Sequence, residues 1–499
     1  MPKRTRLTER PPIQLDPTLP EPLYKQIYGW LRGAILAGQV PRGTRLPSTR
    51  ALATELGVSR TTTALAYDQL LLEGYLESRV GSGTIVSTQL PDGLVEGAHP
   101  ATDNVTKGDG NEPQPRPTTR VATLDAVPQL GRVEGTGSRA FIAGQPALDL
   151  FPYALWGRLL ARNARESLPA HAGYQPAAGY PPLREAIATH IAITRGVRCT
   201  PEQVIITSGT QGALDLIART LLEPGDRAWT EEPGYFGARG ALLAAGAQLV
   251  PVPVDARGLI VAAGRERAPD ARLAVVSPSH QFPTGATMSL GRRLALLDWA
   301  READAWVVED DYDSEYRYRG RPLEALQGLD QAGKVIYVGT FSKVLFPALR
   351  IGYLVAPEPL IPLLLQTRRF VDMHPPILEQ MALADFLREG HYARHLRRTR
   401  PQIQRRRDCL YQELQRHLGW LLDVSLPESG LEFVGWLPPG KDDRRAVALA
   451  DAVDIMVVAV SRQSLEPQPR GGLLMGFAGI DEATIRRSVQ RLAKALREL

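Results

Sequence analysis

The sequence predicts a multidomain protein: a small α+β domain at the N-terminus, a flexible linker, and a large α/β domain with two lobes. Three observations lead to this prediction. The chain has 499 residues, which is too many for one small core. Helical periodicity fills the first part of the chain and disappears between about residues 88 and 137. From residue 138 onward, short apolar strands alternate with helices.

Positive charge is concentrated near the N-terminus, where residues 1–13 form a basic tail. Residues 1–88 contain eleven Lys or Arg and seven Asp or Glu, so they carry +4 of the chain's formal charge of +5. An excess of this kind is typical of a domain that binds phosphates.

Other features of the sequence indicate a cytoplasmic protein. No apolar run follows the charged start MPKRTRLTER, and no stretch of eighteen apolar residues lacks a charge or a proline cluster. We therefore expect neither a signal peptide nor a membrane span. Two cysteines, Cys199 and Cys409, are too few for a disulfide framework and are predicted to be buried thiols. No metal site is predicted.

Residues 14–88 have the pattern of short helices joined by tight turns. In PLYKQIYGWLRGAILAG one helical face ends at Gly38 and contains Leu23, Ile27, Leu31 and Ile35. The next helix begins at the predicted N-cap Ser48 and stops at Gly57, and a third begins at the N-cap Ser59. Two short helices with a glycine in the turn between them form a helix-turn-helix pattern.

The third predicted helix would place its first turn, Arg60 to Thr63, in a major groove, so these side chains are expected to be exposed. Two short strands around Gly81 then form a wing. A three-helix unit that never binds nucleic acid is the alternative, but the basic excess, the polar turn and the glycine-rich wing favour DNA binding.

The run LPSTRALATELGVSRTTTALAYDQLLLEGYL resembles the winged helix-turn-helix of GntR-family bacterial regulators, over about residues 20–88. Arg50 and Arg60 are the best candidates for positioning and base reading. The resemblance implies that DNA contacts come from Arg45, Ser48, Arg50, Ser59, Arg60, Thr61, Thr62 and Gly81.

Residues 89–137 are predicted to be a flexible linker. The segment PDGLVEGAHPATDNVTKGDGNEPQPRPTTR is rich in Pro, Gly and polar residues and has few large apolar side chains. Such a composition cannot bury enough surface to offset the entropy of ordering. We therefore expect the two domains to move independently.

In the large domain, the strand-like runs QVIIT, AVVS, WVVED and VIYVGT each end in polar residues. Ligands of open α/β sheets bind at the carboxyl ends of the strands. Ser208-Gly209-Thr210 follows the first run and opens a helix, which is either an anion site or a tight turn. Tyr235, in EEPGYFG, could stack on a flat ring or simply pack in the core.

Two further stretches carry reactive groups. In VVEDDYDSEYRY, a carboxylate at the strand end could hold a protonated pyridine nitrogen and a nearby phenol could donate to a ring hydroxyl, although a solvated acidic loop is the alternative. In GTFSKVLFPALRIGY, Lys343 could form an imine with an aldehyde. Arg350, with Ser342 and Thr340, could bind a phosphate.

Together these groups match one molecule, pyridoxal 5′-phosphate (PLP). Residues 138–499 resemble fold-type I aminotransferases, with a small C-terminal lobe from about residue 361. The order of the two domains and the motifs SPSHQFPTG, EDDYDSEYRY and GTFSKVLFPALRIGY resemble the MocR subfamily of GntR-family regulators.

The resemblance assigns roles to individual residues. Lys343 would be the Schiff-base lysine, Asp310 would contact the pyridine nitrogen, and Tyr312 the ring hydroxyl. Tyr235 would stack on the ring, and Tyr174 would reach the phosphate of the partner subunit in a domain-swapped, head-to-tail homodimer. The phosphate would be held by Ser208, Gly209, Thr210, Thr340, Ser342 and Arg350.

Two positions depart from the aminotransferase pattern. Phe282 stands where these enzymes have an Asn that contacts the ring hydroxyl, and His280 or Gln281 could replace it. Leu474 stands where the family has an arginine that clamps an amino acid's carboxylate. Arg470 and Arg462 are near in sequence but not in register.

These features predict a transcription regulator that binds an operator in double-stranded DNA and senses a small molecule through bound PLP. The signal is either PLP itself, in control of vitamin B6 synthesis, or an amino acid or amine that forms an imine with PLP. An active aminotransferase is a weaker alternative, because the carboxylate arginine is absent.

One arginine-rich segment, GHYARHLRRTRPQIQRRRDCL, is expected to be a helix interrupted near Pro401. It is either a solvated helix with salt bridges or a second contact to the DNA backbone, through some of the arginines Arg394, Arg397, Arg398, Arg400 and Arg405 to Arg407.

Overall fold

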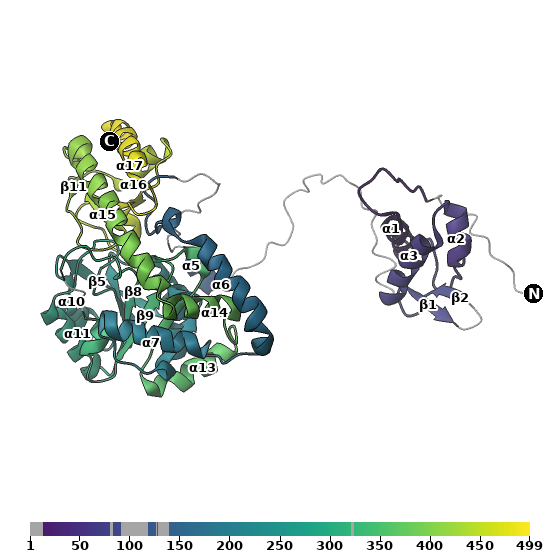
Figure 1. Ribbon diagram of the computed structural model, residues 1–499, viewed down its shortest axis with the longest axis horizontal. Helices are drawn as coiled ribbons and strands as arrows, with labels where there is room; N and C mark the ends of the chain where they lie inside the picture. The colour runs from purple at the N-terminus through teal and green to yellow at the C-terminus, as the bar shows by residue number, and fades with distance from the viewer. Residues whose placement is uncertain (1–12, 80–82, 91–117, 126, 128–138, 321–323) are drawn as a thin grey trace, which may run out of the picture. The chain divides into compact units, whose positions relative to one another are not determined.

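The computed structural model describes residues 13–79, 83–90, 118–125, 127, 139–320 and 324–499. The chain divides into two compact units, residues 1–115 and 116–499, and the described part of each has its own hydrophobic core (Figure 1). The predicted fold class is confirmed.

The N-terminal unit consists of three helices and a β-hairpin: α1 (Leu23–Leu36), α2 (Thr49–Leu56), α3 (Arg60–Leu72), β1 (Leu76–Arg79) and β2 (Gly83–Val86). Both predicted N-caps are present, because Ser48 accepts a hydrogen bond from the Ala51 N–H and Ser59 accepts one from the Thr62 N–H. Gly57 has a φ of 67°, which lets the chain turn between α2 and α3. The predicted wing tip, Gly81, lies outside the described residues.

A short helix, α5 (Thr119–Asp125), lies within the predicted linker and packs against α9 (Phe236–Ala244) of the second unit. The prediction of an unstructured tether over 89–137 was therefore wrong for this segment. Leu124 and Val127 are half-buried, so two apolar side chains are enough to hold this turn of helix on a larger surface.

The large lobe is built on an eight-stranded sheet with the order β3-β10-β9-β8-β7-β4-β5-β6. The neighbours from β9 to β5 run parallel, while β10 and β6 are antiparallel to their neighbours. The four strand-like runs of the sequence are β3, β7, β8 and β9. The strands are β3 (Val204–Thr207), β4 (Arg227–Glu232), β5 (Gln248–Asp255), β6 (Gly258–Leu259), β7 (Leu273–Val276), β8 (Trp306–Asp311), β9 (Val335–Thr340) and β10 (Gly352–Val355).

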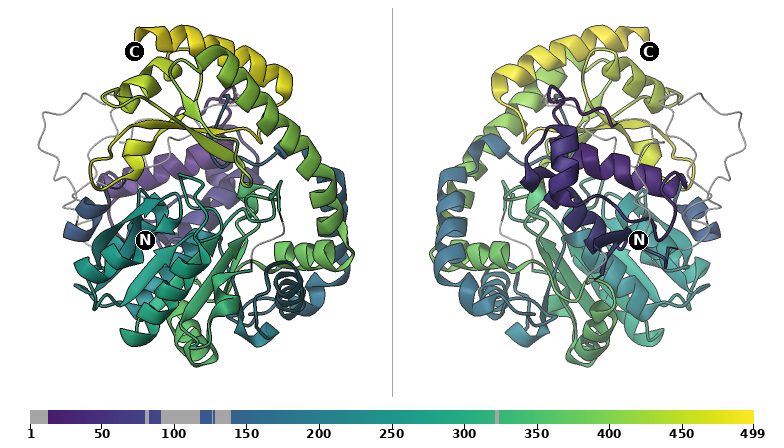
Figure 2. Two further views of the ribbon diagram at one scale, coloured as in Figure 1. Left: turned by 90° about the vertical axis from the view of Figure 1, so that its left-hand side faces the viewer. Right: turned by 90° about the vertical axis from the view of Figure 1, so that its right-hand side faces the viewer.

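Helices cover both faces of this sheet (Figure 2). Alternate residues of β3 enter different clusters: Ile205 packs with α8 and α9, whereas Ile206 joins the cluster that contains α7 and α14. A third cluster contains α10 and α11. The helices are α6 (Tyr153–Glu166), α7 (Pro181–Arg195), α8 (Thr210–Leu221), α10 (Val261–Arg267), α11 (Leu290–Glu302), α12 (Leu326–Leu329), α13 (Ile361–Arg369) and α14 (Ile377–Arg388).

The small lobe contains a four-stranded antiparallel sheet with the order β11-β12-β14-β13, covered by α16 (Asp443–Asp451) and α17 (Glu482–Ala495). Its strands are β11 (Asp423–Val424), β12 (Glu432–Trp436), β13 (Val458–Ala459) and β14 (Gly472–Gly476). The predicted start at residue 361 is too early, because α13 packs on α8 and α14 packs on α6 and α7 of the large lobe.

One long helix, α15 (His391–Leu418), connects the two lobes (Figure 2). It continues through Pro401, so the predicted interruption is wrong. Burial of the apolar side chains Leu396, Ile403 and Leu410 along one face outweighs the hydrogen bond that the proline removes.

Two of the seven arginines proposed for a second DNA contact are buried in α15. Arg406 pairs with Asp149, and Arg407 pairs with Asp408 and lies 4.4 Å from the centre of the Tyr318 ring. Both side chains are less than 7% exposed, so neither can reach DNA. The exposed members of the set are Arg394, Arg397, Arg398 and Arg405, so the second-contact hypothesis stays a prediction for these four.

Cys199 is half-buried and Cys409 is buried, and both are free thiols. Within the described residues, no helix is both long enough and apolar enough to span a membrane.

Candidate ligand-binding and DNA-binding sites

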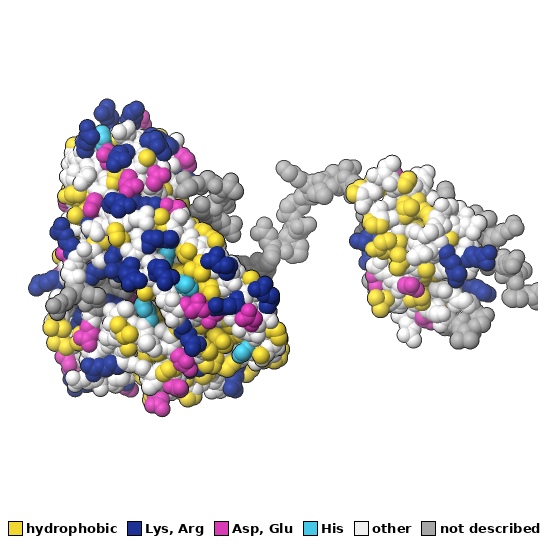
Figure 3. Space-filling model, viewed as in Figure 1, with side chains coloured by type: hydrophobic (Ala, Val, Ile, Leu, Met, Phe, Trp, Pro, Cys, Tyr) yellow, Lys and Arg dark blue, Asp and Glu magenta, His cyan; other side chains and the backbone are white. Residues whose placement is uncertain are grey.

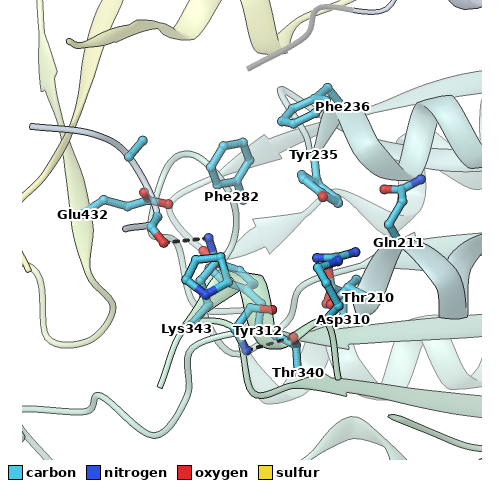
Figure 4. A pocket seen from close by; sticks show the side chains of 15 residues that line it. Thr210, Gln211, Tyr235, Phe236, Phe282, Asp310, Tyr312, Thr340, Lys343 and Glu432 are labelled. Atoms are coloured by element: carbon cyan, nitrogen blue, oxygen red, sulfur yellow. Dashed lines mark hydrogen bonds between the residues drawn. The ribbon is translucent and has the colours of Figure 1, made fainter. Parts of the chain in front are cut away.

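A cavity of about 200 Å³ opens at the carboxyl ends of the large-lobe strands and extends to the small lobe. Most of the predicted site residues surround it (Figure 4). The predicted residues that line it are Thr210, Tyr235, Asp310, Tyr312, Thr340, Ser342, Lys343 and Arg350. Lining residues that sequence reasoning missed are Ala143, Gly144, Gln211, Phe236, Pro347 and Glu432.

Lys343 follows β9 and projects into the cavity, where its Nζ donates a hydrogen bond to the Gly144 carbonyl at 3.0 Å. Gly144 has a φ of 70°, and a Cβ at this position would overlap Nζ. The positive φ favours a glycine here, and a side chain at this position would also displace the Lys343 amine, which is the end of a flexible side chain.

Gly144→Ala is expected to displace the Lys343 amine and to weaken any ligand that bonds to it. The positive φ adds a backbone cost of about 1 kcal/mol. The expected result is at least a tenfold rise in the PLP concentration needed for half-saturation, measured by the visible absorbance of the bound cofactor. Gly240→Ala is a matched control, because a Cβ there meets nothing within 4 Å. Equal PLP affinity in the two variants would contradict this role of Gly144.

Asp310, on β8, faces the cavity with an unsatisfied charge. Its side chain is 5% exposed, and Oδ1 has no hydrogen-bond partner within the described structure. Burial raises the pKa of Asp310 to about 7, with Asp311 adding to the shift and Lys343 opposing it. A protonated ring nitrogen would supply the missing partner and favour the carboxylate.

Asp310→Asn is expected to flatten the pH dependence of stability of the cofactor-free protein. Between about pH 4 and pH 7 folded Asp310 keeps a proton that the unfolded chain releases, so its contribution to stability falls as the pH rises. Denaturant titrations at about pH 5 and pH 8 should show that the free energy of unfolding falls less between these two pH values for the variant than for the wild type. Asp298→Asn, at an exposed position, is the control. Identical losses in wild type and Asp310→Asn would contradict the raised pKa.

The Tyr312 hydroxyl lies next to a buried histidine, which in turn contacts a buried carboxylate. Its hydroxyl lies 3.1 Å from His280 Nδ1, which lies 2.9 Å from Asp313. Burial alone lowers the pKa of His280, but the Asp313 carboxylate outweighs it and the pKa is raised. Burial raises the pKa of Tyr312, so the phenol stays protonated and can act as a hydrogen-bond donor.

Of the two candidates to replace the missing Asn, His280 acts through Tyr312, whereas Gln281 is occupied elsewhere. The Gln281 amide donates to the Pro233 carbonyl and accepts from Thr284, so it stabilises its own turn. Phe282 itself lines the cavity, with its ring 6.0 Å from that of Tyr235 and nearly perpendicular to it. Burial raises the pKa of Tyr235 to about 12.

The end of the cavity near α8 has the features of an anion site. Arg350 donates to the Ser208 carbonyl at 2.7 Å, and a Cβ on Gly209 would lie 3.2 Å from the guanidinium. Arg350 itself has a φ of 50°, a strained conformation that directs its side chain toward the start of α8. The Thr340 hydroxyl accepts from the Ser342 N–H at 3.2 Å (Figure 4).

Three predicted residues lie outside the cavity lining. Ser208 lies in the same loop, but its side chain lines a neighbouring cavity with Arg368 and Asp372. Gly209 contributes only its close approach to Arg350. Tyr174 is 85% exposed, next to His374.

Among the described residues that line the cavity, no arginine of the small lobe, neither Arg462 nor Arg470, takes the place of the missing clamp. Leu474 is fully buried among Val434 and Val460. Arg470 pairs with Asp423 at 3.1 Å and lies over the Trp436 ring, beside a different cavity.

In the N-terminal unit, the predicted DNA contacts are mostly exposed. Arg45, Arg50, Arg60 and Thr61 are exposed, and the Arg45 guanidinium lies against Gly83 of the wing. Figure 3 shows basic side chains gathered on one side of this unit. Thr63 was predicted to be exposed but is fully buried, because its hydroxyl donates to the Thr49 carbonyl at 2.8 Å and so joins α3 to α2.

These two sites define a DNA-binding regulator fused to an aminotransferase-like domain, and comparisons with known proteins agree. Residues 23–86 match the family described as bacterial regulatory proteins, gntR family, and residues 156–492 match aminotransferase class I and II. The chain belongs to the MocR-type transcription regulators of the GntR family.

The chain is 42% identical to the probable rhizopine catabolism regulatory protein MocR of Rhizobium meliloti, over 97% of this chain and 95% of that protein. It is 32% identical to the pyridoxine biosynthesis transcriptional regulator PdxR of Corynebacterium glutamicum, over 97% of this chain and 98% of that protein. A solved structure of α-aminoadipate aminotransferase LysN from Thermus thermophilus, complexed with phosphopyridoxyl-leucine, matches with a TM-score of 0.67 and 31% identity. That match covers 74% of this chain and 96% of LysN.

Proposed function

We propose that the aminotransferase-like domain binds PLP through Lys343 and uses it to sense a small molecule that changes operator binding. The observation that carries this proposal is the unpartnered, buried Oδ1 of Asp310 in the same cavity as the Lys343 amine. When bound, PLP supplies an aldehyde that can bond to an amine. The cavity fits the group because it offers an amine, a carboxylate and an anion site in one space.

Each residue has a defined task in this proposal. Lys343 would bond to the aldehyde, Asp310 would accept a hydrogen bond from the ring nitrogen, and Tyr312 would donate one to the ring hydroxyl. Tyr235 would cover the ring and exclude water. The phosphate would be held by the backbone at the start of α8 and by Thr210, Thr340, Ser342 and Arg350.

The signal is proposed to be an amine-bearing molecule, and the name of the relative from R. meliloti, at 42% identity, supports control of a catabolic pathway. The second candidate is PLP itself as the signal, which the relative that regulates pyridoxine biosynthesis favours. Either ligand regulates only if it binds one DNA-competent arrangement better than another.

The experiment that separates the two candidates is a titration of the full-length protein with PLP while DNA affinity is followed. A change in DNA affinity with PLP alone supports PLP as the signal. Cofactor binding without such a change supports an amine as the signal. Absence of any visible absorbance band that depends on Lys343 would overturn the proposal.

We do not expect physiological transamination, because Leu474 occupies the position at which aminotransferases have the arginine that binds the substrate carboxylate. Incubation with amino donors and a keto acid should give no more than slow turnover. Multiple turnovers at the rates of ordinary enzymes, about 1–10³ per second, would contradict a role in sensing alone.

We further propose a domain-swapped, head-to-tail homodimer in which Tyr174 reaches the partner's phosphate. Tyr174 is 85% exposed, and the apolar side chains Phe370, Val371 and Met373, at the end of α13, are also exposed. Exposed apolar side chains of this size suggest a surface that a second copy covers. Sedimentation of the full-length protein should give a dimer, which Phe370→Glu weakens.

Arg60→Ala is expected to reduce affinity for operator DNA by about 1–3 kcal/mol and to relax specificity at one base pair. Arg60 is exposed at the first position of α3, the position expected to reach base edges. The measurement is binding to a double-stranded probe selected from random sequence by the wild-type protein. Arg32→Ala is the control, because Arg32 is exposed but lies against Tyr75 on another part of the unit. An equal loss of DNA affinity in the Arg60→Ala and Arg32→Ala proteins would indicate only a general effect of charge.

A further inference from the structure

The wall of the PLP cavity that the small lobe supplies carries a buried acidic group, one oxygen of which has no hydrogen-bond partner among the described residues. Glu432 begins β12, is 4% exposed and lines the cavity. The Gly144 N–H hydrogen-bonds to its carboxylate, while Oε2 has no partner within the described structure. In Figure 4, Glu432 lies on the Lys343 side of the cavity, opposite Thr210 and Gln211. A ligand amine bonded in place of Lys343 would carry its substituents past this group.

The positive neighbours of Glu432 are Lys343 and His280, and His280 is already paired with Asp313. Ala143 and Phe282 line the cavity and pack against the apolar cluster of Val434, Val460 and Leu474. Among the described residues that line the cavity, the cations are Lys343 and Arg350, and Arg350 is directed at the anion site at the start of α8. A carboxylate next to the ligand's amine would therefore meet an apolar wall and a second carboxylate.

We propose that the molecule sensed is a primary amine without a carboxylate, whose hydroxyl or second ammonium group donates a hydrogen bond to Glu432. The inference rests on the proposed function, since it specifies the ligand of the same PLP site. A site with a buried, unpaired acceptor discriminates strongly in favour of ligands that carry the matching donor. Apart from Lys343 and Arg350, no cation is among the described residues that line the cavity, which disfavours amino acids, and Glu432 selects the donor.

The test uses the full-length, PLP-loaded protein and pairs of probes that differ only in a carboxylate: ethanolamine against serine, and putrescine against ornithine. The readout is the change in visible absorbance of the bound cofactor as each probe is added. We expect half-saturation by the decarboxylated member of each pair at a concentration at least about tenfold lower, because the carboxylate of the other member must leave water for an apolar wall and a second acidic group. Equal or tighter binding of the amino acids would overturn the inference.

Two variants test the residues responsible. Glu432→Gln should weaken the binding of ethanolamine and putrescine about tenfold. It should also narrow the difference in affinity between these amines and the corresponding amino acids, serine and ornithine. Leu474→Arg should strengthen the two amino acids by restoring a carboxylate partner. Glu358→Gln, an exposed glutamate away from the cavity, is the matched control. The comparison of probe pairs on the wild-type chain stands even if a variant does not fold.

The outcomes separate this inference from the function on which it rests. If PLP gives no absorbance band that depends on Lys343, both fail. If the band forms and the amino acids bind at least as well as the amines, PLP binding stands and only the assignment of the ligand class fails.

Discussion

Replacing Lys343 with alanine is expected to abolish the lysine-dependent visible absorbance of PLP and the response of DNA binding to the amine. Lys343 is the only lysine among the described residues that line the cavity, so no second amine there can take its place. Removal of the amine also leaves the Gly144 carbonyl without its hydrogen bond. The measurement is an absorbance titration with PLP, combined with operator binding in the presence and absence of ethanolamine.

Lys441→Ala provides the matched control, because Lys441 is exposed and bonds only to the chain terminus among the described contacts. The Lys441→Ala protein should keep both the visible absorbance band of PLP and the response of DNA binding to ethanolamine. A Lys343→Ala protein that still formed the same band would show that another amine binds the aldehyde, and the assignment of the site would be wrong.

Replacing Arg407 with alanine is expected to lower the free energy of unfolding by about 2–4 kcal/mol. The Arg407 side chain is 2% exposed, bonds to Asp408 and to the Pro427 carbonyl, and stacks on Tyr318. Its loss leaves a cavity beside Tyr318 and a carbonyl without its donor. Denaturant titration of the second unit's unfolding transition measures the change.

Arg405→Ala is the control for this experiment, two residues away on the same helix. Arg405 is 63% exposed and pairs with Glu482 at 3.6 Å, so its loss should cost no more than about 0.5 kcal/mol. Similar stabilities for the two variants would contradict the structural role of Arg407. A loss of DNA affinity confined to Arg405→Ala would support the second-contact hypothesis.

The sequence was sufficient to predict the elements whose causes are local. Ser48 and Ser59 are read as N-caps because they precede amphipathic helices, and both accept the expected backbone hydrogen bonds. Lys343, which follows strand β9, could be placed in one site with the residues at the ends of the neighbouring strands, because the carboxyl ends of parallel strands lie at the same edge of a sheet. The order of the strands, by contrast, depends on pairings between distant segments.

The predictions that failed depend on contacts between distant segments. Arg407 looks like a solvated residue in its own helix, and only the position of Tyr318 makes it a buried one. Thr63 differs from its neighbours Thr61 and Thr62 only in facing Thr49. Glu432 was missed because it lies 89 positions after Lys343, in a strand of the other lobe, with no motif around it.

The bond from Thr63 to the Thr49 carbonyl has a consequence for how the protein could respond to its ligand. It joins α3 to α2, so we expect the two helices of the DNA-reading unit to move together and to keep their base preferences. What a sensor can change is the distance and rotation between two such units in a dimer. Half-sites fall on one face of the double helix only at multiples of about 10.5 base pairs. Ligand binding should therefore alter the preferred half-site spacing and leave the half-site sequence unchanged.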